Sequence, residues 1–152
     1  MQPLKEKLLE KELNFMDKFK AEILQQWCDK GKDDLRSAEY LSTMHHPTPD
    51  EIICFLCQQS AEKYLKAFIF SHDIEPEKTH DLRELLKVCE ENDPNFSSLL
   101  SKLQILTRYG VMPRYPNDLE ITSDDMKTAI QYARDVQEFV LQVLKEENTS
   151  EE

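Results

Sequence analysis

The chain contains only two glycines, Gly31 and Gly110, in 152 residues. Tight β-hairpin turns and the phosphate-binding loops of Rossmann-like folds depend on glycine, because they need a positive φ or a close backbone approach. Long stretches of the chain are instead rich in Leu, Glu, Lys, Ala and Gln, which are strong helix formers. The sequence therefore predicts an all-α protein and disfavours all-β and Rossmann-like folds.

Apolar residues recur at the spacing of a helix in five parts of the chain. These parts are residues 24–44, 53–69, 82–89, 96–106 and 126–144. They predict an up-and-down bundle of about five helices, in which the segment 53–69 is central because its apolar face is the widest. Residues 3–26 form an additional, strongly charged helical pattern, which either continues into the segment 24–44 or is separated from it by a bend.

Local signals indicate where the helices begin. At the start of the central helix, Thr48 is a suitable cap, Pro49 suits the first helical position and Glu51 completes a capping box. Further helix starts are expected at Thr79 or Asp81, at Asp93–Pro94, and at Thr122 or Ser123.

Three polar residues interrupt the apolar pattern of the predicted central helix. Gln58, Glu62 and Lys66 follow one another at intervals of four residues, so their side chains lie on one side of a helix. We expect them to pair with one another along its solvent-facing surface.

The length of the chain fits a single domain that can bury a core without a disulfide or a metal. We divide it into a helical extension over residues 1–26, a bundle over residues 27–144 and an acidic tail over residues 145–152. The tail carries no apolar residue, and we expect it to be disordered.

The formal net charge of −11 restricts the partners of this protein. A long nucleic-acid backbone repels such a chain, so general DNA binding is not expected, although a small basic site for one nucleotide or one RNA loop is compatible with it. The chain has no run of about 18 apolar residues and no signal-peptide pattern at its start. We therefore expect a cytoplasmic protein that does not span a membrane.

The four cysteines lie within apolar helical stripes, and Cys54 and Cys57 form a single CxxC pair. A zinc site would need two further ligands, which histidines could supply in principle. The alternative, which we favour, is that all four are buried reduced thiols, because cysteine is among the most frequently buried residue types. No metal and no cofactor is predicted. The histidines considered are His45, His46, His72 and His80.

The segment 106–118 is not explained by packing. It contains Arg108, Tyr109, Arg114 and Tyr115, together with two prolines that stiffen the backbone. Guanidinium groups bind phosphate in a bidentate manner, and tyrosine rings offer flat faces to bases. We interpret these four residues as a candidate anion or nucleotide site. The alternative is that the arginines pair with carboxylates and the tyrosines pack.

A second candidate is the segment 78–82, in which His80 lies at the start of a predicted helix and Lys78 precedes it. The N-terminal dipole of that helix favours the neutral imidazole, which can act as a base or as a hydrogen-bond partner. The structural alternative is that His80 caps the helix or fills a gap in the packing.

Several segments together resemble the HEPN family of higher eukaryote and prokaryote nucleotide-binding domains. Residues 54–67 read Cys-Phe-Leu-Cys-Gln-Gln-Ser-Ala-Glu-Lys-Tyr-Leu-Lys-Ala, and residues 78–82 read Lys-Thr-His-Asp-Leu. Trp27 and Asp34 precede them, and residues 106–109 and 114–116 follow in the order found in the family. The resemblance covers about residues 27–144.

The resemblance implies a helical bundle that usually forms a homodimer. It also implies a frequent pairing with a minimal nucleotidyltransferase in toxin–antitoxin or related systems. Active members are metal-independent RNases, whose motif is an arginine followed after four to six residues by a histidine. Arg108 matches the arginine of that motif, but no histidine follows it, and Arg114 stands where one would be sought. Since arginine does not release its proton near neutral pH, acid–base catalysis through that position is disfavoured.

Three functions are compatible with these observations. The first is a non-catalytic homodimeric module that binds a nucleotide or RNA phosphate through Arg108 and Arg114, with Tyr109, Tyr115, Lys78 and His80 nearby. The second is an RNase toxin in which His80 acts with Arg108. The third is a dimeric protein-interaction scaffold without a ligand, whose helix over residues 3–26 contacts another protein. We favour the first and expect that the chain is not an enzyme.

Overall fold

The computed structural model describes residues 2–44, 47–110 and 120–150. Within these ranges all regular elements are helices, which confirms the predicted all-α class and the bundle of about five helices. The α-helices are α1 (Gln2–Leu41), α2 (Asp50–Ser71), α3 (Leu82–Asn92), α4 (Leu100–Leu106) and α5 (Ser123–Ser150). Two 3₁₀ segments, η1 (Pro94–Leu99) and η2 (Thr107–Tyr109), flank α4.

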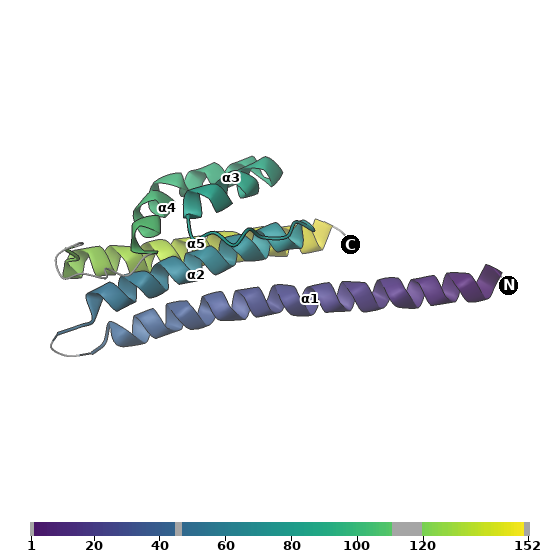
Figure 1. Ribbon diagram of the computed structural model, residues 1–152, viewed down its shortest axis with the longest axis horizontal. Helices are drawn as coiled ribbons and strands as arrows, with labels where there is room; N and C mark the ends of the chain where they lie inside the picture. Colours follow the sequence, from purple (N-terminus) through teal and green to yellow (C-terminus); the bar gives the residue numbers. More distant parts are fainter. Residues whose placement is uncertain (1, 45–46, 111–119, 151–152) are drawn as a thin grey trace.

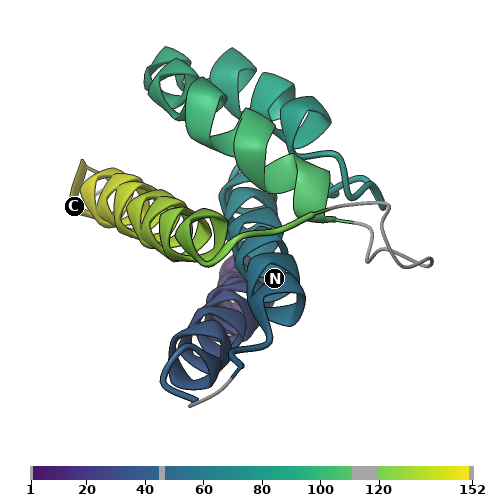
Figure 2. The same cartoon turned by 90° about the vertical axis from the view of Figure 1, so that its left-hand side faces the viewer.

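Helix α2 occupies the centre of the bundle, as its wide apolar pattern predicts, and contacts α1, α3, α4 and α5. Helices α1 and α2 run antiparallel, and α5 runs in the direction of α2 (Figure 1). Figure 2, a view along the bundle, shows α3 and α4 on the side of α2 opposite α1. No described helix contains a stretch that is long and apolar enough to cross a membrane.

The charged pattern over residues 3–26 and the segment that follows it form one helix without a break. α1 spans 40 residues and ends at Leu41. Beyond its last turn, the hydroxyl of Ser42 donates to the carbonyl oxygen of Glu39 (2.6 Å) and that of Thr43 to the carbonyl oxygen of Tyr40 (2.7 Å). These bonds satisfy carbonyls that have no partner within the helix.

The other helix ends agree with the sequence signals in three places and differ in two. At the expected start Asp93–Pro94, the side chain of Asp93 caps η1 by accepting a hydrogen bond from the backbone N–H of Asn95 (3.0 Å). Asp81 caps α3, and Thr122 forms a reciprocal box with Asp125 at the start of α5. The prediction of a capping box at the start of α2 is wrong. The hydroxyl of Thr48 donates to the side chain of Asp50, and Pro49, the residue before the helix, makes no side-chain cap. Helix α5 continues to Ser150, where the sequence led us to expect a disordered tail from residue 145.

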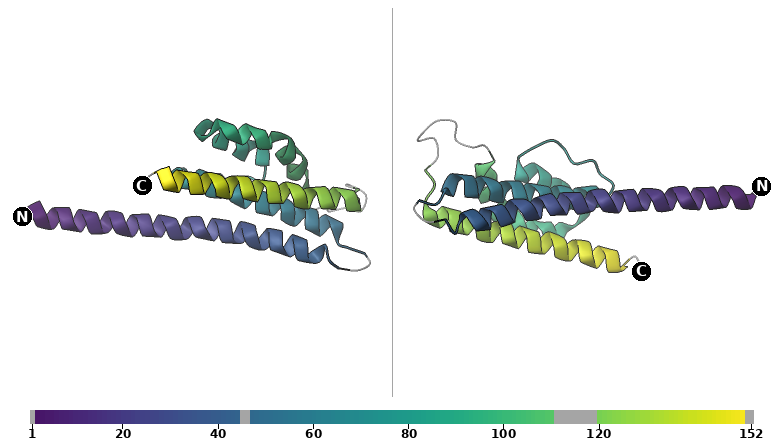
Figure 3. Two further views of the ribbon diagram at one scale, coloured as in Figure 1. Left: turned by 180° about the vertical axis from the view of Figure 1, so that it is seen from behind. Right: turned by 90° about the horizontal axis from the view of Figure 1, so that it is seen from below.

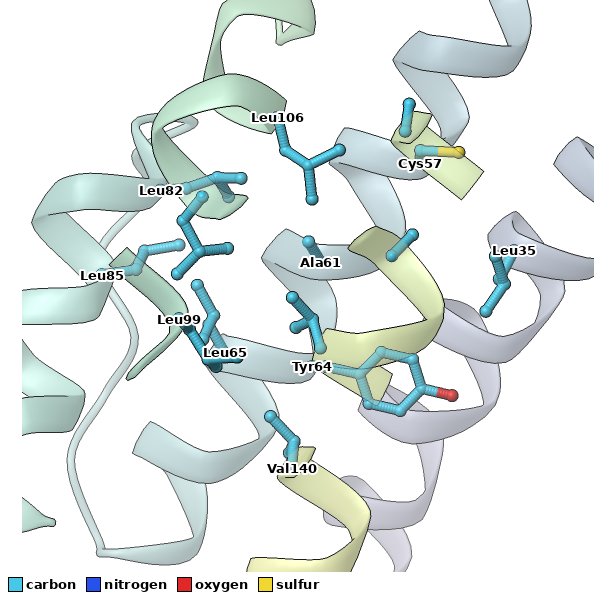
Figure 4. Packing of buried hydrophobic residues seen from close by; sticks show 14 of the residues in the cluster. Leu35, Cys57, Ala61, Tyr64, Leu65, Leu82, Leu85, Leu99, Leu106 and Val140 are labelled. Atoms are coloured by element: carbon cyan, nitrogen blue, oxygen red, sulfur yellow. The ribbon is translucent and has the colours of Figure 1, made fainter. Parts of the chain in front are cut away.

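The core fills the space between α2 and the helices around it (Figure 4). Leucines from α3 and from the η1–α4 segment meet α2 on one side, and Tyr64 of α2 points toward α1 and α5 on the other. Phe68, Phe96 and Phe139 form an aromatic row, with ring centroids 4.3 and 4.9 Å apart. Leu100, the first residue of α4, belongs to the apolar pattern over residues 96–106 but is 42% exposed.

Candidate functional site

One cleft brings together the two segments that the sequence singled out. His80, just before α3, and Arg108, in η2, both line a cleft of about 580 Å³. Asp81 and Thr107 also line it, together with Gly110. Residues far apart in the chain thus share one site because the start of α3 and η2 meet beside α2.

Thr107 connects the two sides of the cleft. Its hydroxyl oxygen accepts a hydrogen bond from the backbone N–H of Leu82 (3.0 Å), the first residue of α3. The backbone N–H of Arg83 donates to the carboxylate of Asp81 (2.9 Å), which makes Asp81 the cap of α3. Arg108 follows Thr107 in the chain, and His80 precedes Asp81. These bonds therefore hold Arg108 beside His80.

Two arginines line the cleft, and they differ in whether a carboxylate of the protein already binds the guanidinium. The guanidinium of Arg83 donates to both carboxylate oxygens of Asp81 (3.0 and 3.1 Å), and this hydrogen bonding lowers the pKa of Asp81. Arg108 is exposed and forms no ion pair with a carboxylate of the described residues. Arg108 thus lines the cleft without an ion pair among the described residues, whereas the charge of Arg83 is neutralised by Asp81.

His80 is held in a defined orientation by α2. Its Nδ1 lies 2.8 Å from a carboxylate oxygen of Glu62, and its backbone carbonyl accepts a hydrogen bond from the side-chain amide of Gln58 (3.0 Å). The side chain itself is 68% exposed. A carboxylate bound at Nδ1 sets the tautomer and leaves Nε2 as the ring nitrogen that Glu62 does not engage.

The three polar residues spaced by four along α2 are buried, so the prediction that they lie on the solvent-facing surface of the helix is wrong. Gln58, Glu62 and Lys66 are only 0, 4 and 7% exposed. His80 covers Glu62 from the α3 side, and the ring of Trp27 in α1 lies over Lys66, with Nζ 6.0 Å from its centroid. Inside the row, Lys66 Nζ lies 3.3 Å from a carboxylate oxygen of Glu62, which pairs the two buried charges.

Glu62 is thus the site residue that the sequence interpretation missed, although a signal for it was present. Apolar residues occupy nearly every side of α2, so a polar residue on this helix has little solvent to face. A helix apolar all round is buried, and its polar residues then pair inside the protein.

The remaining candidate residues lie in different surroundings. Lys78 is exposed and is not part of the cleft lining. Tyr109 is only 7% exposed and packs in the core, and burial raises the pKa of its hydroxyl. Arg114 and Tyr115 lie outside the described residues. The structure therefore brings together His80 and Arg108.

The cysteines are free thiols in the structure. Cys54, Cys57 and Cys89 are buried, and burial raises the pKa of Cys54 to about 12 and those of Cys57 and Cys89 further. Such thiols stay protonated near neutral pH, while metal ligation requires thiolate. In the described ranges, no three His, Cys, Asp or Glu residues are grouped as a metal site would require, and His45 and His46 lie outside those ranges.

Comparison with known proteins agrees with the helical fold described above. The sequence pattern of the HEPN domain matches residues 24–146. The crystal structure of TT1696 from Thermus thermophilus has the same fold, with a TM-score of 0.66 and 22% identity over 78% of this chain and 96% of that one. The structure of ST0689, an archaeal HEPN homologue, gives a TM-score of 0.61 and 25% identity over 78% and 95% of the two chains. No curated protein matches the chain. Since the family pattern extends over most of its length, the chain belongs to the HEPN domain family.

Proposed function

We propose that this protein is a non-catalytic module that binds the phosphate of a nucleotide or of RNA in the cleft at His80 and Arg108. The observation that carries the proposal is the exposed guanidinium of Arg108, which has no carboxylate partner among the described residues. In a chain with a net charge of −11, such a group is a local site for an anion. His80 supplies a second hydrogen-bonding group across the same cleft.

Two further parts of the proposal follow from the family resemblance. We propose that the module acts as a homodimer and that its partner is a minimal nucleotidyltransferase of a toxin–antitoxin-like pair. Arg114, Tyr115 and Lys78 remain candidate contacts in this proposal, because they lie near the cleft residues in sequence, whereas Tyr109 is buried in the core.

Replacing Arg108 by alanine is expected to weaken phosphate binding at least tenfold. A charge-assisted hydrogen bond contributes about 1.5–3 kcal/mol, and about 1.4 kcal/mol corresponds to a factor of ten in affinity. Binding of ATP and of a labelled single-stranded RNA is measured separately by calorimetry and fluorescence anisotropy. Arg134→Ala is the matched control, because it removes the same charge from α5, where Arg134 pairs with Glu39 (2.8 Å). The proposal is rejected if neither probe saturates or if both variants bind equally well.

An RNase is the second candidate function, and the pairing of His80 with Glu62 favours it. A histidine held at Nδ1 by a carboxylate is suited to take a proton at Nε2. In RNA it would accept the proton of a 2′-hydroxyl while that oxygen attacks the phosphorus. The bond from phosphorus to the 5′-oxygen breaks, the leaving oxygen takes up a proton, and a 2′,3′-cyclic phosphate forms. The charge of Arg108 would stabilise the additional negative charge on the phosphate oxygens.

If the protein is such an RNase, His80→Ala is expected to lower the rate of cleavage by about 10²–10⁴-fold, the usual contribution of a general acid or base. His72→Ala is the matched control, since His72 also pairs with a glutamate, Glu147 (2.8 Å), but outside the cleft. Cleavage is followed by gel electrophoresis of a labelled RNA. Wild-type protein that leaves the RNA intact, or His80→Ala that cleaves normally, excludes this candidate.

A further inference from the structure

A groove on the surface lies between helix α5 and the segment formed by η1 and α4. Helix α5 is straight, and α3 and α4 lie along one side of it (Figures 2 and 3). The groove has a volume of about 680 Å³. Its lining on α5 extends from Asp135 to Glu146, which is about 16 Å at 1.5 Å per residue. The groove is therefore long enough to hold about three turns of another helix.

The floor of this groove is apolar. Leu99 and Val143 are 3 and 9% exposed, and Phe139 is half-buried against Phe96, with ring centroids 4.9 Å apart. Phe139 and Val143 are four residues apart and so lie on the same side of α5. An apolar group of a partner placed in the groove would cover the part of these side chains that water still reaches.

The rims of the groove are acidic. Asp93 stands on the η1 side, and Glu138 and Glu146 stand on the α5 side. None of these three carboxylates forms an ion pair within the part of the chain that the structure describes. The fourth acidic residue, Asp135, is paired with Lys102 (2.9 Å), which is the one basic residue of the described lining. The groove, here called the acidic groove, thus joins an apolar floor to three carboxylates that no described cation pairs with.

Other hollows of the surface do not share this charge. Two further grooves beside α5, of about 560 and 740 Å³, are each lined by two acidic and two basic residues. The cleft at His80 and Arg108 has the opposite excess, with two arginines and one aspartate. The charge of the acidic groove is therefore a local feature, and it does not simply repeat the net charge of −11.

This charge selects the occupant of the acidic groove. Its carboxylates repel anionic lipids and the phosphates of nucleic acids. A second copy of the chain carries the same net charge of −11, which opposes its approach to this groove. A basic amphipathic helix of another protein offers lysine or arginine side chains to the rims and apolar side chains to the floor.

We propose that the acidic groove binds a basic amphipathic helix of a partner protein. Glu138 and Glu146 are eight residues apart, which separates them by about 12 Å along α5. Two basic residues about seven or eight positions apart on the partner helix match that distance. Apolar residues about three or four positions after the first of them lie on the same side and face Phe139 and Val143. The acidic groove contains none of the cleft residues, so this proposal is independent of the proposed phosphate site.

Binding of a designed peptide tests the proposal. The probe is a fluorescein-labelled helix of about five turns, built from lysine, leucine and alanine with the spacing given above. Fluorescence anisotropy measures its dissociation constant. Glu138→Gln/Glu146→Gln is expected to raise that constant at least about fivefold, the combined effect of two partly exposed ion pairs.

A matched control separates the groove from the net charge. Glu12→Gln/Glu22→Gln removes the same charge from exposed positions of α1, and we expect it to change the dissociation constant by less than about twofold, because salt screens distant charges. Circular dichroism confirms that both double variants stay folded, since all four positions are exposed.

A second peptide, with glutamine in place of leucine, tests the apolar floor. It is expected to bind the wild type at least about tenfold more weakly, because its apolar burial is lost. Spermine, a linear polyamine without apolar side chains, is expected to bind more weakly than the first peptide.

Four results would overturn the proposal. The first peptide does not saturate the wild type, or the two double variants bind it equally well. The glutamine peptide or spermine binds as tightly as the first peptide, which would show a site for any cation. Finally, sedimentation finds a dimer that only Glu138→Gln/Glu146→Gln loses, which would place a second copy in the acidic groove.

Discussion

Gly31→Val is expected to destabilise the fold by about 2–3 kcal/mol, the upper part of the range for overpacked sites. Gly31 is buried where α1 meets α2, and a Cβ there would lie 2.8 Å from Cε2 and 2.9 Å from Cδ2 of Tyr64. The Tyr64 ring is 1% exposed, and its hydroxyl accepts a hydrogen bond from Gln137 (2.9 Å), so it has no space into which to move. The helices would have to separate.

Denaturant unfolding followed by circular dichroism measures this effect. Lys32→Val is the control, because it introduces the same side chain one residue further along, on the exposed face. We expect it to change the stability by less than about 0.5 kcal/mol, as is usual for surface positions. Equal stability of Gly31→Val and wild type would show that α1 and α2 do not pack as closely as the structure has them.

Glu62→Ala is expected to cost about 3–5 kcal/mol, the usual effect of removing one partner of a buried ion pair. The substitution leaves Lys66, which is 7% exposed, without its carboxylate. It also removes the group that holds His80 at Nδ1. The double variant Glu62→Ala/Lys66→Met is expected to recover part of the loss, because the unpaired charge is then absent.

Glu39→Ala is the control for this prediction. Glu39 pairs with Arg134 on the surface, where both side chains are more than a third exposed, and exposed pairs contribute about 0–1 kcal/mol. Thermal and denaturant unfolding of the four proteins gives the comparison. If Glu62→Ala is no less stable than Glu39→Ala, the Glu62–Lys66 pair is not buried as described.

The class of fold and much of the core could be predicted from the residues of each segment. Few glycines and repeated apolar spacing correctly predicted helices packed around α2, because the faces of a helix follow from its own residues. The caps at Asp81 and Thr122 were predictable for the same reason, since a cap bonds within three residues. The continuity of α1 was left open, because the sequence marks no break there but does not exclude one.

Two other features depend instead on how the helices pack. One is the burial of Gln58, Glu62 and Lys66, and the other is the cleft that His80 shares with Arg108. Spacing of four residues shows that polar side chains share one side of a helix, but not what covers that side. Here Trp27 of α1 and the segment before α3 cover it, and neither belongs to α2. A cleft assembled from residues distant in the chain depends on such long-range contacts, which periodicity within one helix does not contain.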